Sequence, residues 1–445
     1  IPVLSEIDDI VAVAKKVKAD EALIAIPSAN STEIRRIIDV CKESGLNFKT
    51  IPGMSELING KVTVNAIREV AYQDLLGREI IHLDEEQIGA HLKNQNVLVT
   101  GAGGSIGSEL CRQICRFEPE KIILFERAES PLHAIELELK QSFKEVNVVP
   151  ILADIQNLNQ LNKAFKLNRP QIVFHAAAYK HVPMLEIQPW KAIDNNVLGT
   201  KNLIDVSTKN KVARFVFVST DKAVRPANIM GASKRLSEML VQGQNACGLS
   251  QTRFVIVRFG NVVGSVGSVV PLFRKQIQEG GPVTVTHPEV TRFFMTIPEA
   301  AQLVLQAGAM GEGGEIFILD MGEPVKITYL AEQLIRLSGK EPGRDIQIVY
   351  TGLRPGEKLF EELFHELEPY DTTQHEKIFL AHPRPADWDE LSEELRAAEL
   401  AVRRYDTRKL KDILLRLVPE LAKTPISTRP GAAADVVPLN RTINR

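Results

Sequence analysis

Short apolar runs alternate with longer amphipathic segments through the middle of the chain. Helical spacing is clear at 106–116, and the apolar runs, each short enough for a buried strand, are 96–100, 121–125, 147–152, 171–174, 213–218 and 253–257. Strands that alternate with helices predict an α/β fold with a doubly wound parallel sheet. We expect this main domain to cover residues 93–423.

After about residue 260 the pattern becomes less regular and richer in glycine and proline. Such a region is typical of a smaller C-terminal substrate lobe, and helices near 328–338 and 388–403 are expected to close it. The last segment, 424–445, has no periodicity, so we predict a flexible tail.

The first 75 residues have an α/β pattern of their own, with helices expected at 5–18 and 31–44 and strands at 21–27 and 47–52. Two strands are too few for a stable parallel sheet. We therefore expect 1–75 to be part of a Rossmann-like domain, followed by a connector at 76–92. The chain begins with Ile1, which favours a fragment of a longer protein.

The composition limits the possible partners. The 445 residues are 44% hydrophobic and 25% charged with a net charge of −2, as in soluble globular proteins, which gives no argument for nucleic acid or an anionic membrane surface. There is no apolar run of about 18 residues and no signal peptide. The four cysteines lack zinc spacing, so we predict no metal site and interpret them as reduced core thiols of a cytosolic protein.

A glycine-rich turn follows the strand at 96–100. Residues 100–107 read TGAGGSIG, with Gly101, Gly104 and Gly107 between that strand and a helix that begins with Ser105 and Ile106. The glycines allow a tight turn, close approach of a pyrophosphate and close helix–strand packing, and the helix N-terminus favours phosphate. This context predicts a dinucleotide site.

An acid at the end of the second strand favours NAD over NADP. Glu126 stands where a carboxylate bonds the ribose 2′-hydroxyl and repels a 2′-phosphate. Arg127 could receive that phosphate, which keeps NADP as the less favoured alternative, or be a solvated surface charge. Asp154 is expected beside the adenine or as a helix N-cap. The remaining candidates for the cofactor site are Ile155, Ala176, Ala177 and Ala178.

The stretch from 218 to 234, VSTDKAVRPANIMGASK, carries the candidate catalytic residues. Thr220, Asp221 and Lys222 follow an apolar strand, at the edge where open α/β sheets place ligands. A short-chain dehydrogenase has a tyrosine four residues before its active-site lysine, but here Met230 precedes Lys234 and cannot exchange a proton. We therefore expect the acid–base work to fall on Thr220, Asp221 and Lys222.

The chain resembles the extended short-chain dehydrogenase/reductase family, and more closely the membrane-anchored bacterial UDP-N-acetylglucosamine 4,6-dehydratases of polysaccharide and glycan biosynthesis. The shared segments are TGAGGSIGSEL (100–110), FHAAAYKHVPMLE (174–186), NNVLGT (195–200), VSTDKAVRPANIMGASK (218–234), RFGNVVGSVGSVVPLF (258–273), VTRFFMTIPEA (290–300) and RPGEKLFEEL (354–363). The resemblance implies a Rossmann-type NAD-binding domain and membrane helices that are absent from this chain.

The resemblance also implies a reaction without net redox change. Hydride leaves sugar C4 for NAD⁺, a base removes the C5 proton while an acid protonates the leaving C6 hydroxyl, and hydride returns to C6. Asp221 would be the acid, and through Thr220 the acceptor of the C4 hydroxyl proton. Lys222 would be the C5 base, its pKa lowered by burial or by a cation at Lys180 or Lys234. Lys234 would bond the nicotinamide ribose, and Thr220 the C4 oxygen.

Polar residues of the later segments are candidates for the substrate site: Lys180, Asn261, Arg292, Arg354 and Glu357. Asn261 matches a family position near the diphosphate, and the two arginines could hold phosphate oxygens. Glu357 could hold the uridine ribose. A turn asparagine and surface salt bridges are the structural alternatives, and Arg258 is explained equally well by either.

Two other functions stay open. A UDP-sugar C4 epimerase shares the fold, the cofactor and the C4 oxidation but needs neither a C5 base nor a C6 acid. A non-catalytic module that senses NAD or a sugar nucleotide is favoured by Met230 and disfavoured by Asp221, Lys222 and Lys234. From the resemblance we also expect a homo-oligomer, membrane-anchored in full length, at the cytoplasmic face of the bacterial inner membrane.

Overall fold

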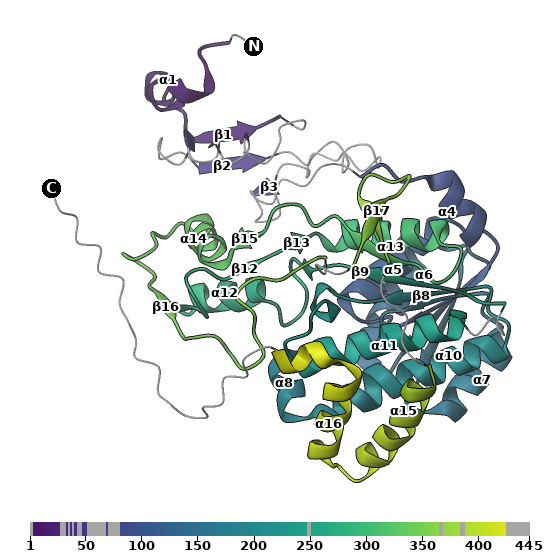
Figure 1. The fold of residues 1–445 in the computed structure, drawn as a ribbon. Coiled ribbons are helices and arrows are strands. Elements are labelled where there is room, and N and C mark those ends of the chain that lie inside the picture. Colours follow the sequence, from purple (N-terminus) through teal and green to yellow (C-terminus); the bar gives the residue numbers. More distant parts are fainter. Residues whose placement is uncertain are drawn as a thin grey trace.

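The computed structural model describes residues 3–26, 33, 36–37, 40–41, 47–50, 68–69, 81–246, 251–364, 368–382 and 388–423. Its main sheet has nine strands (Figure 1). Across the sheet they are β6 (Asn147–Leu152), β5 (Lys121–Glu126), β4 (Asn96–Thr100), β7 (Ile172–His175), β8 (Arg214–Val218), β9 (Arg253–Arg258), β14 (Ile316–Leu319), β18 (Ile378–Ala381) and β17 (Tyr370–Thr372). The strands from β6 to β14 run parallel, β18 pairs antiparallel with β14, and β17 pairs antiparallel with β18, which confirms the predicted doubly wound sheet.

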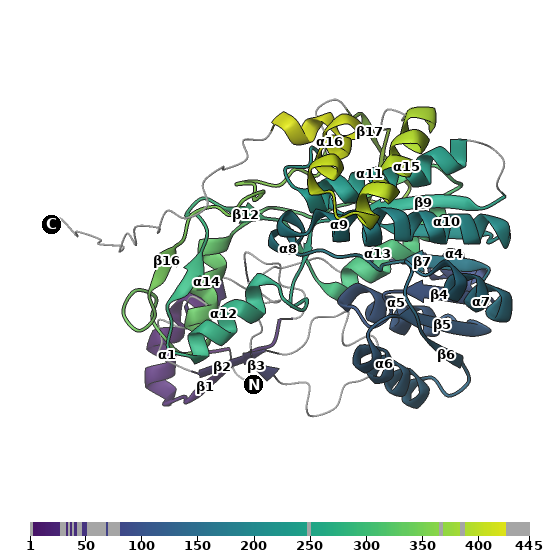
Figure 2. The same cartoon turned by 90° about the horizontal axis from the view of Figure 1, so that it is seen from below.

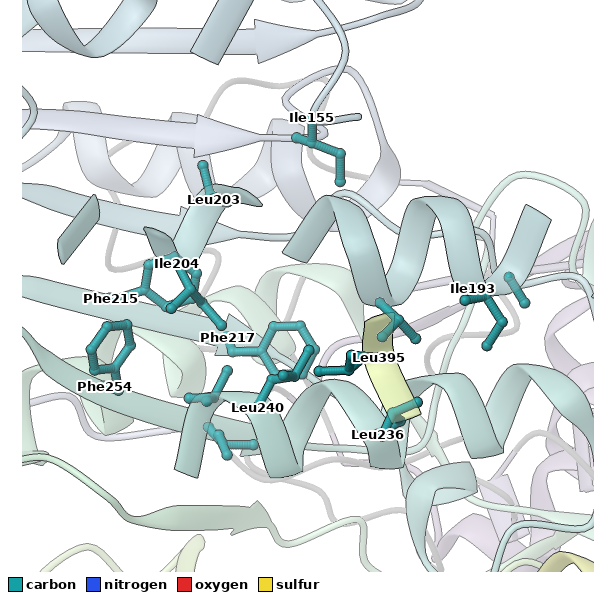
Figure 3. Close-up of a cluster of buried hydrophobic side chains, with 14 of the residues drawn as sticks. Ile155, Ile193, Leu203, Ile204, Phe215, Phe217, Leu236, Leu240, Phe254 and Leu395 are labelled. Carbon is teal, nitrogen blue, oxygen red and sulfur yellow. The ribbon is translucent and has the colours of Figure 1, made fainter. Parts of the chain in front are cut away.

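Helices cover both faces of this sheet because successive strand residues point to opposite sides. One face carries α4 (Glu85–Leu92), α5 (Ser105–Cys115), α6 (Glu129–Ser142) and α13 (Ile297–Met310). The other carries α7 (Leu158–Asn168), η4 (Ala192–Gly199), α10 (Thr200–Lys209) and α11 (Ile229–Ala246). In Figure 3, Phe217 of β8 lies beside Leu240 of α11, and Phe215 lies beside Ile204 and Phe254, within the second of these cores.

Helix α4 occupies part of the segment expected as a connector. Ile88 and Leu92 of α4 are buried in the core of the first face. The backbone N–H of Asp84 donates to Gln306 Oε1 of α13 at 2.8 Å, and Gln306 donates in turn to Gln87 at 2.9 Å. Helix α4 and the residue before it are therefore packed on the main domain.

A helical hairpin near the C-terminus adds a third layer. It consists of α15 (Trp388–Arg403) and α16 (Thr407–Leu417), followed by η6 (Pro419–Lys423). Leu391 and Leu395 of α15 share the core with α11, next to the short helices α8 (Val182–Ile187) and α9 (Pro189–Lys191) (Figure 2). The expected helix at 388–403 is confirmed.

The smaller lobe contains short strand pairs and two helices. Its elements are β10 (Asn261–Val262), α12 (Val269–Gln278), β11 (Val283–Val285), β12 (Thr291–Arg292), β13 (Phe294–Met295), β15 (Val325–Lys326), α14 (Ile327–Leu337) and β16 (Ile348–Tyr350). The lobe has a core of its own, which also includes Ile24, Ile37 and Cys41. Helix α13 and strands β14, β17 and β18 return to the main sheet, so only part of the sequence after 260 belongs to the lobe.

The N-terminal part contains η1 (Ile7–Asp9), α1 (Ile10–Val17), β1 (Glu21–Ile24), β2 (Asn47–Thr50) and β3 (Arg68–Glu69). Strand β1 pairs with β2 in parallel, and β3 adds an antiparallel strand that the sequence pattern did not predict. The expected helix at 31–44 lies largely, and the tail at 424–445 wholly, outside the described residues. Within the described part, no helix has the length and apolar character needed to cross a membrane.

Candidate active site

The glycine-rich turn and the catalytic stretch meet at one edge of the sheet. Strand β4 pairs with β7, β7 with β8 and β8 with β9, all in parallel, so their carboxyl ends lie together. The strand order reverses between β4 and β7. Open α/β sheets bind their ligands at such a reversal. The TGAGGSIG turn follows β4, and Thr220, Asp221 and Lys222 follow β8.

The turn after β4 has the shape that a pyrophosphate requires. Gly101 has a φ of +66°, and a Cβ on it would lie 2.9 Å from the Cα of Ala177. A Cβ on Gly107 would lie 2.0 Å from the Gly101 carbonyl oxygen. Among the described residues no side chain caps the N-terminus of α5 at Gly104, which leaves its N–H groups for an anion. These residues fit the diphosphate of a dinucleotide.

The Glu126 carboxylate, at the end of β5, accepts a hydrogen bond from the backbone of this turn. It accepts from the N–H of Gly103 at 3.1 Å and from the N–H groups of Arg127 and Ala128 at 2.9 Å. Ser105 Oγ, on the other side, accepts from the Val266 N–H at 3.3 Å, so the turn is also tied to the lobe segment after β10.

Arg127 is exposed, as the surface-charge alternative expected, but it has partners: its guanidinium lies 4.4 Å from the centre of the Tyr179 ring, hydrogen-bonds the Tyr179 hydroxyl and is 3.8 Å from Asp154. One neighbouring prediction needs a correction. Asp154 is not the N-cap of α7, because Asn157 takes that position and accepts from Gln160 N–H. Instead, Asp154 Oδ1 accepts from the Gln156 N–H at 2.9 Å in a local turn.

The small residues after β7 lie against the turn, as their size predicted. Ala176 and Ala177 are half-buried, and the N–H of Ala177 donates to Thr100 Oγ1 at 3.3 Å. Ala178 is exposed, whereas Ile155 is buried. A Cβ on Gly199 would lie 2.8 Å from Ile155, which therefore packs on η4.

Helix α11 brings Lys234 under the end of β8. Lys234 Nζ donates to the Val218 carbonyl at 2.6 Å and lies 3.8 Å from the centre of the Phe217 ring. Burial lowers the pKa of Lys234 to about 7. Met230, one turn earlier, is 4% exposed and belongs to the apolar core. The position expected for a tyrosine therefore supplies packing and no proton.

Asp221 is completely buried at the start of a short turn, η5 (Asp221–Ala223). Its Oδ1 accepts from Thr220 Oγ1 at 2.9 Å and from Lys222 Nζ at 3.0 Å. Its Oδ2 is buried without a hydrogen-bond partner among the described residues. Burial raises the pKa of Asp221, since a desolvated carboxylate is costly. Asp221 can therefore hold a proton, and Thr220 is its route toward the surface of the site.

Lys222 contradicts one expectation. Three oxygens surround Nζ: Asp221 Oδ1 at 3.0 Å, Asn261 Oδ1 at 3.1 Å and Glu361 Oε1 at 3.5 Å. Burial favours the neutral amine, but the two carboxylates outweigh it and raise the pKa of Lys222. The prediction of a lowered pKa was wrong, and the cation that acts on Lys222 is Arg292 rather than Lys180 or Lys234.

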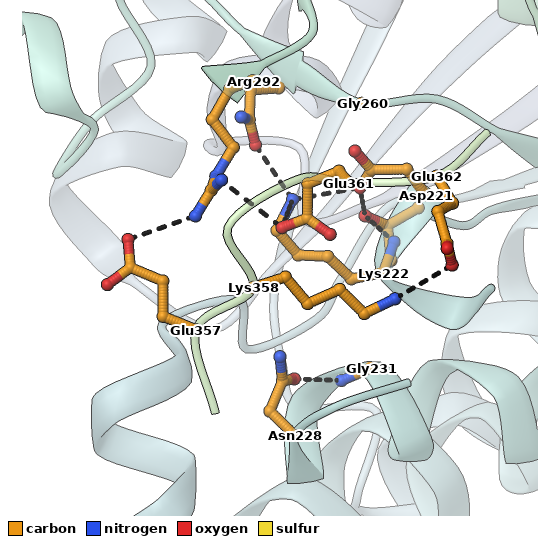
Figure 4. A network of polar contacts seen from close by, with 12 residues as sticks. Asp221, Lys222, Asn228, Gly231, Gly260, Arg292, Glu357, Lys358, Glu361 and Glu362 are labelled. Carbon is orange, nitrogen blue, oxygen red and sulfur yellow. Dashed lines mark hydrogen bonds and ion pairs between the residues drawn. The ribbon is translucent and has the colours of Figure 1, made fainter. Parts of the chain in front are cut away.

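The segment after β16 completes the site from the lobe side (Figure 4). Glu361, with its side chain 5% exposed, lies between Lys222 and Arg292, whose Nε is 3.7 Å away. Arg292 also donates to Glu357 at 3.1 Å. The buried Arg292 thus pairs with the half-buried Glu357. The Arg354 side chain is exposed, and its backbone N–H donates to Glu357.

This lobe segment is tied to the catalytic stretch. Asn228 donates to the Gly356 carbonyl at 2.9 Å and accepts from the Gly231 N–H at 2.8 Å. Lys358 Nζ donates to the Val224 carbonyl at 3.3 Å. Lys180 is exposed and donates to Ser265 at 3.3 Å, away from Lys222.

A buried ionic network supports the site from behind. Glu238 of α11 accepts from Ser219 at 2.7 Å and from Arg258 at 2.8 Å, and Arg258 also donates to Glu368 at 2.7 Å. The guanidinium of Arg258 is therefore engaged inside the protein, not in phosphate binding. The sequence analysis missed Glu238 and Glu361. Glu238 had one usable signal, because it lies four residues after Lys234 on the same helix face.

Comparison with known proteins agrees with this geometry. A family model described as polysaccharide biosynthesis protein matches residues 97–383. The chain belongs to this polysaccharide biosynthesis family. It is 49% identical over 374 residues to the capsular polysaccharide biosynthesis protein CapD of Staphylococcus aureus. The matched region is 84% of this chain but only 62% of that protein's own length.

Two further relatives of this chain have names that state a reaction. The inverting UDP-N-acetylglucosamine 4,6-dehydratase of Campylobacter jejuni is 35% identical over 292 residues, 65% of this chain and 83% of that protein. A UDP-glucose 4-epimerase of Rickettsia canadensis is 35% identical over 278 residues, 61% and 77%. The fold is shared with a Streptomyces venezuelae dTDP-glucose 4,6-dehydratase solved with NAD (TM-score 0.54, 22% identity, 61% of this chain, 88% of that one).

Proposed function

We propose that the chain catalyses the NAD-dependent dehydration of UDP-N-acetylglucosamine to UDP-2-acetamido-2,6-dideoxy-4-hexulose in polysaccharide or glycan biosynthesis. One observation carries the proposal. A buried aspartic acid, which accepts from a lysine and from a threonine hydroxyl, lies at the ligand-binding edge of the sheet, while the tyrosine position holds Met230. An epimerase needs no such acid–base pair.

The glycine turn would hold the diphosphate of NAD, with Glu126 on its ribose side and Lys234 near the nicotinamide ribose. When bound, NAD⁺ accepts hydride from C4 and returns it to C6. Arg292 and Glu357 lie on the lobe side, where a UDP-sugar would enter. This supports a nucleotide-sugar substrate, since arginine suits phosphate oxygens.

The protons can be followed through named atoms. The C4 hydroxyl proton passes through Thr220 Oγ1 to Asp221 Oδ1, 2.9 Å away. Asp221 then returns that proton, again through Thr220, to the C6 hydroxyl, which leaves as water. The C5 proton goes to the amine of Lys222 and is given back to C5 after hydride reaches C6. Each group thereby ends in the state in which it began.

The test is incubation with UDP-N-acetylglucosamine and NAD⁺ in D₂O, followed by proton NMR. A new C6 methyl signal with deuterium at C5 is the expected result, and Asp221→Asn should form it far more slowly. Formation of UDP-N-acetylgalactosamine without a methyl signal would identify a 4-epimerase. Bound NAD⁺ with no change in the sugar would refute the proposal in favour of a sensing module.

Membrane anchoring, a place at the inner membrane and homo-oligomerisation stay predictions. Sedimentation of the chain in solution would test the assembly.

A further inference from the structure

Lys222 faces a difficulty that the proposed reaction exposes. A C5 base must be a neutral amine, yet Lys222 is surrounded by three oxygens and its charge is held by two carboxylates. Once Asp221 has received the C4 hydroxyl proton, it is neutral and cannot also take a proton from Lys222. Another acceptor has to be within reach of Nζ.

We propose that Glu361 accepts the ammonium proton of Lys222 and so prepares the C5 base. Glu361 Oε1 lies 3.5 Å from Lys222 Nζ, and its side chain is 5% exposed, so a proton passed there stays inside the site. The bond from Nζ to this proton breaks and a carboxyl O–H forms. After C5 is reprotonated, the same proton returns to Lys222. Glu361 acts through Lys222, and is therefore a positioning residue.

Arg292 links this transfer to substrate binding. In the free protein Arg292 lies 3.7 Å from Glu361 and bonds Glu357, and with Lys222 and Lys358 it keeps Glu361 ionised. A substrate diphosphate that draws Arg292 away would leave Glu361 with less positive charge around it. The carboxylate then becomes a better proton acceptor, at the moment when the C5 base is needed.

The charged groups around Lys222 are Asp221, Glu361 and Arg292, and they determine the direction in which a substitution shifts the pKa of Lys222. Glu361→Gln removes a negative charge and the proton acceptor together. Loss of the charge lowers the pKa of Lys222, but without an acceptor inside the site the neutral amine forms only when the proton leaves to solvent, so activity becomes dependent on pH and rises with it. One unit in pKa corresponds to about a tenfold change in the neutral fraction.

We expect Glu361→Gln to be strongly impaired near neutral pH and to regain activity by roughly tenfold per pH unit as pH rises, whereas the wild type changes little. Glu361→Asp should keep the wild-type profile. Glu362→Gln is the matched control, because the adjacent Glu362 contacts Lys358 and Arg225 instead. An equal loss at every pH in Glu361→Gln would overturn the proposal.

A second readout does not depend on the substrate. Acetic anhydride modifies neutral amines, so acetylation of Lys222 in the free protein, followed by mass spectrometry, reports its protonation. Glu361→Gln should be acetylated about tenfold faster at a given pH, and Glu362→Gln at the wild-type rate. Unchanged acetylation in Glu361→Gln would contradict the proposal even if the dehydratase assignment holds. The pH profile of activity depends on the proposed function, whereas the acetylation of Lys222 does not.

Discussion

Replacing Glu238 by glutamine removes the negative charge from the network behind the catalytic stretch. The Glu238 side chain is fully buried and that of Arg258 is 2% exposed. Removing one partner of a buried ion pair costs about 3–5 kcal/mol, because the other charge is left without compensation. Arg258 keeps Glu368 at 2.7 Å, so we expect the lower end, about 3 kcal/mol of unfolding free energy.

The pH dependence of this effect has a definite sign. Burial opposes the ionised form of Glu238, but Arg258 outweighs burial and lowers the pKa of Glu238. A carboxylate with a depressed folded-state pKa contributes stability above its unfolded-state pKa of about 4.3 and loses it as pH falls through the folded value. The difference between wild type and Glu238→Gln should therefore be constant from about pH 6 to about pH 8.

The assay is urea unfolding followed by circular dichroism, and the same strand provides the control. Arg253 of β9 pairs with Glu312 at 2.8 Å, the distance seen for Arg258 and Glu238, but with side chains 48% and 74% exposed. Glu312→Gln should cost less than about 1 kcal/mol. If the two glutamine variants lose similar stability, the argument from burial is refuted.

Three further predictions follow from the site. In the wild type, the folded-state pKa of Lys234 is about 7, so the free energy of unfolding should rise by roughly 1 kcal/mol per pH unit from that value up to about pH 10. Lys234→Met should remove this rise, which unfolding curves measured without cofactor would show. Gly107→Ala should prevent NAD⁺ binding in calorimetry, since its Cβ would lie 2.0 Å from a carbonyl oxygen of the turn, whereas Gly89→Ala, with 3.7 Å of room, should bind normally. Asp221→Asn should lower kcat for C6 methyl formation by about 10²–10⁴, and Met230→Leu, a volume-conserving core change, should leave it near wild type.

The centre of the main sheet could be predicted from the sequence because strands β4, β5, β7, β8 and β9 are largely buried on both faces. Such strands appear as continuous apolar runs, and the run at 96–100 matches β4 to the residue. The run at 147–152 also matches β6 to the residue, although this edge strand is less buried. The glycine turn was also predictable, since its spacing between a strand and a helix leaves few alternatives.

Glu361 could not be found in this way. It stands next to Glu362 in a charged segment, and the two acids are equivalent in the sequence. Only the packing of the lobe segment, through Asn228 and Lys358, turns Glu361 toward Lys222 and leaves Glu362 near the surface. The pKa of Lys222 was predicted wrongly for the same reason: burial and a neighbouring cation were considered, and the second carboxylate was unknown.

Met230 and Glu361 can be understood as one adaptation. A tyrosine at position 230 would receive the C4 proton beside Lys234, and Asp221 would stay ionised as the counter-ion of Lys222. With Met230 in the core, the proposed reaction passes that proton through Thr220 to Asp221, which then loses its charge partway through. The proposed transfer therefore requires a second carboxylate next to Lys222, both to hold the ammonium in the free protein and to receive its proton. On this proposal, the missing tyrosine explains why the lysine of this site is placed between two acids.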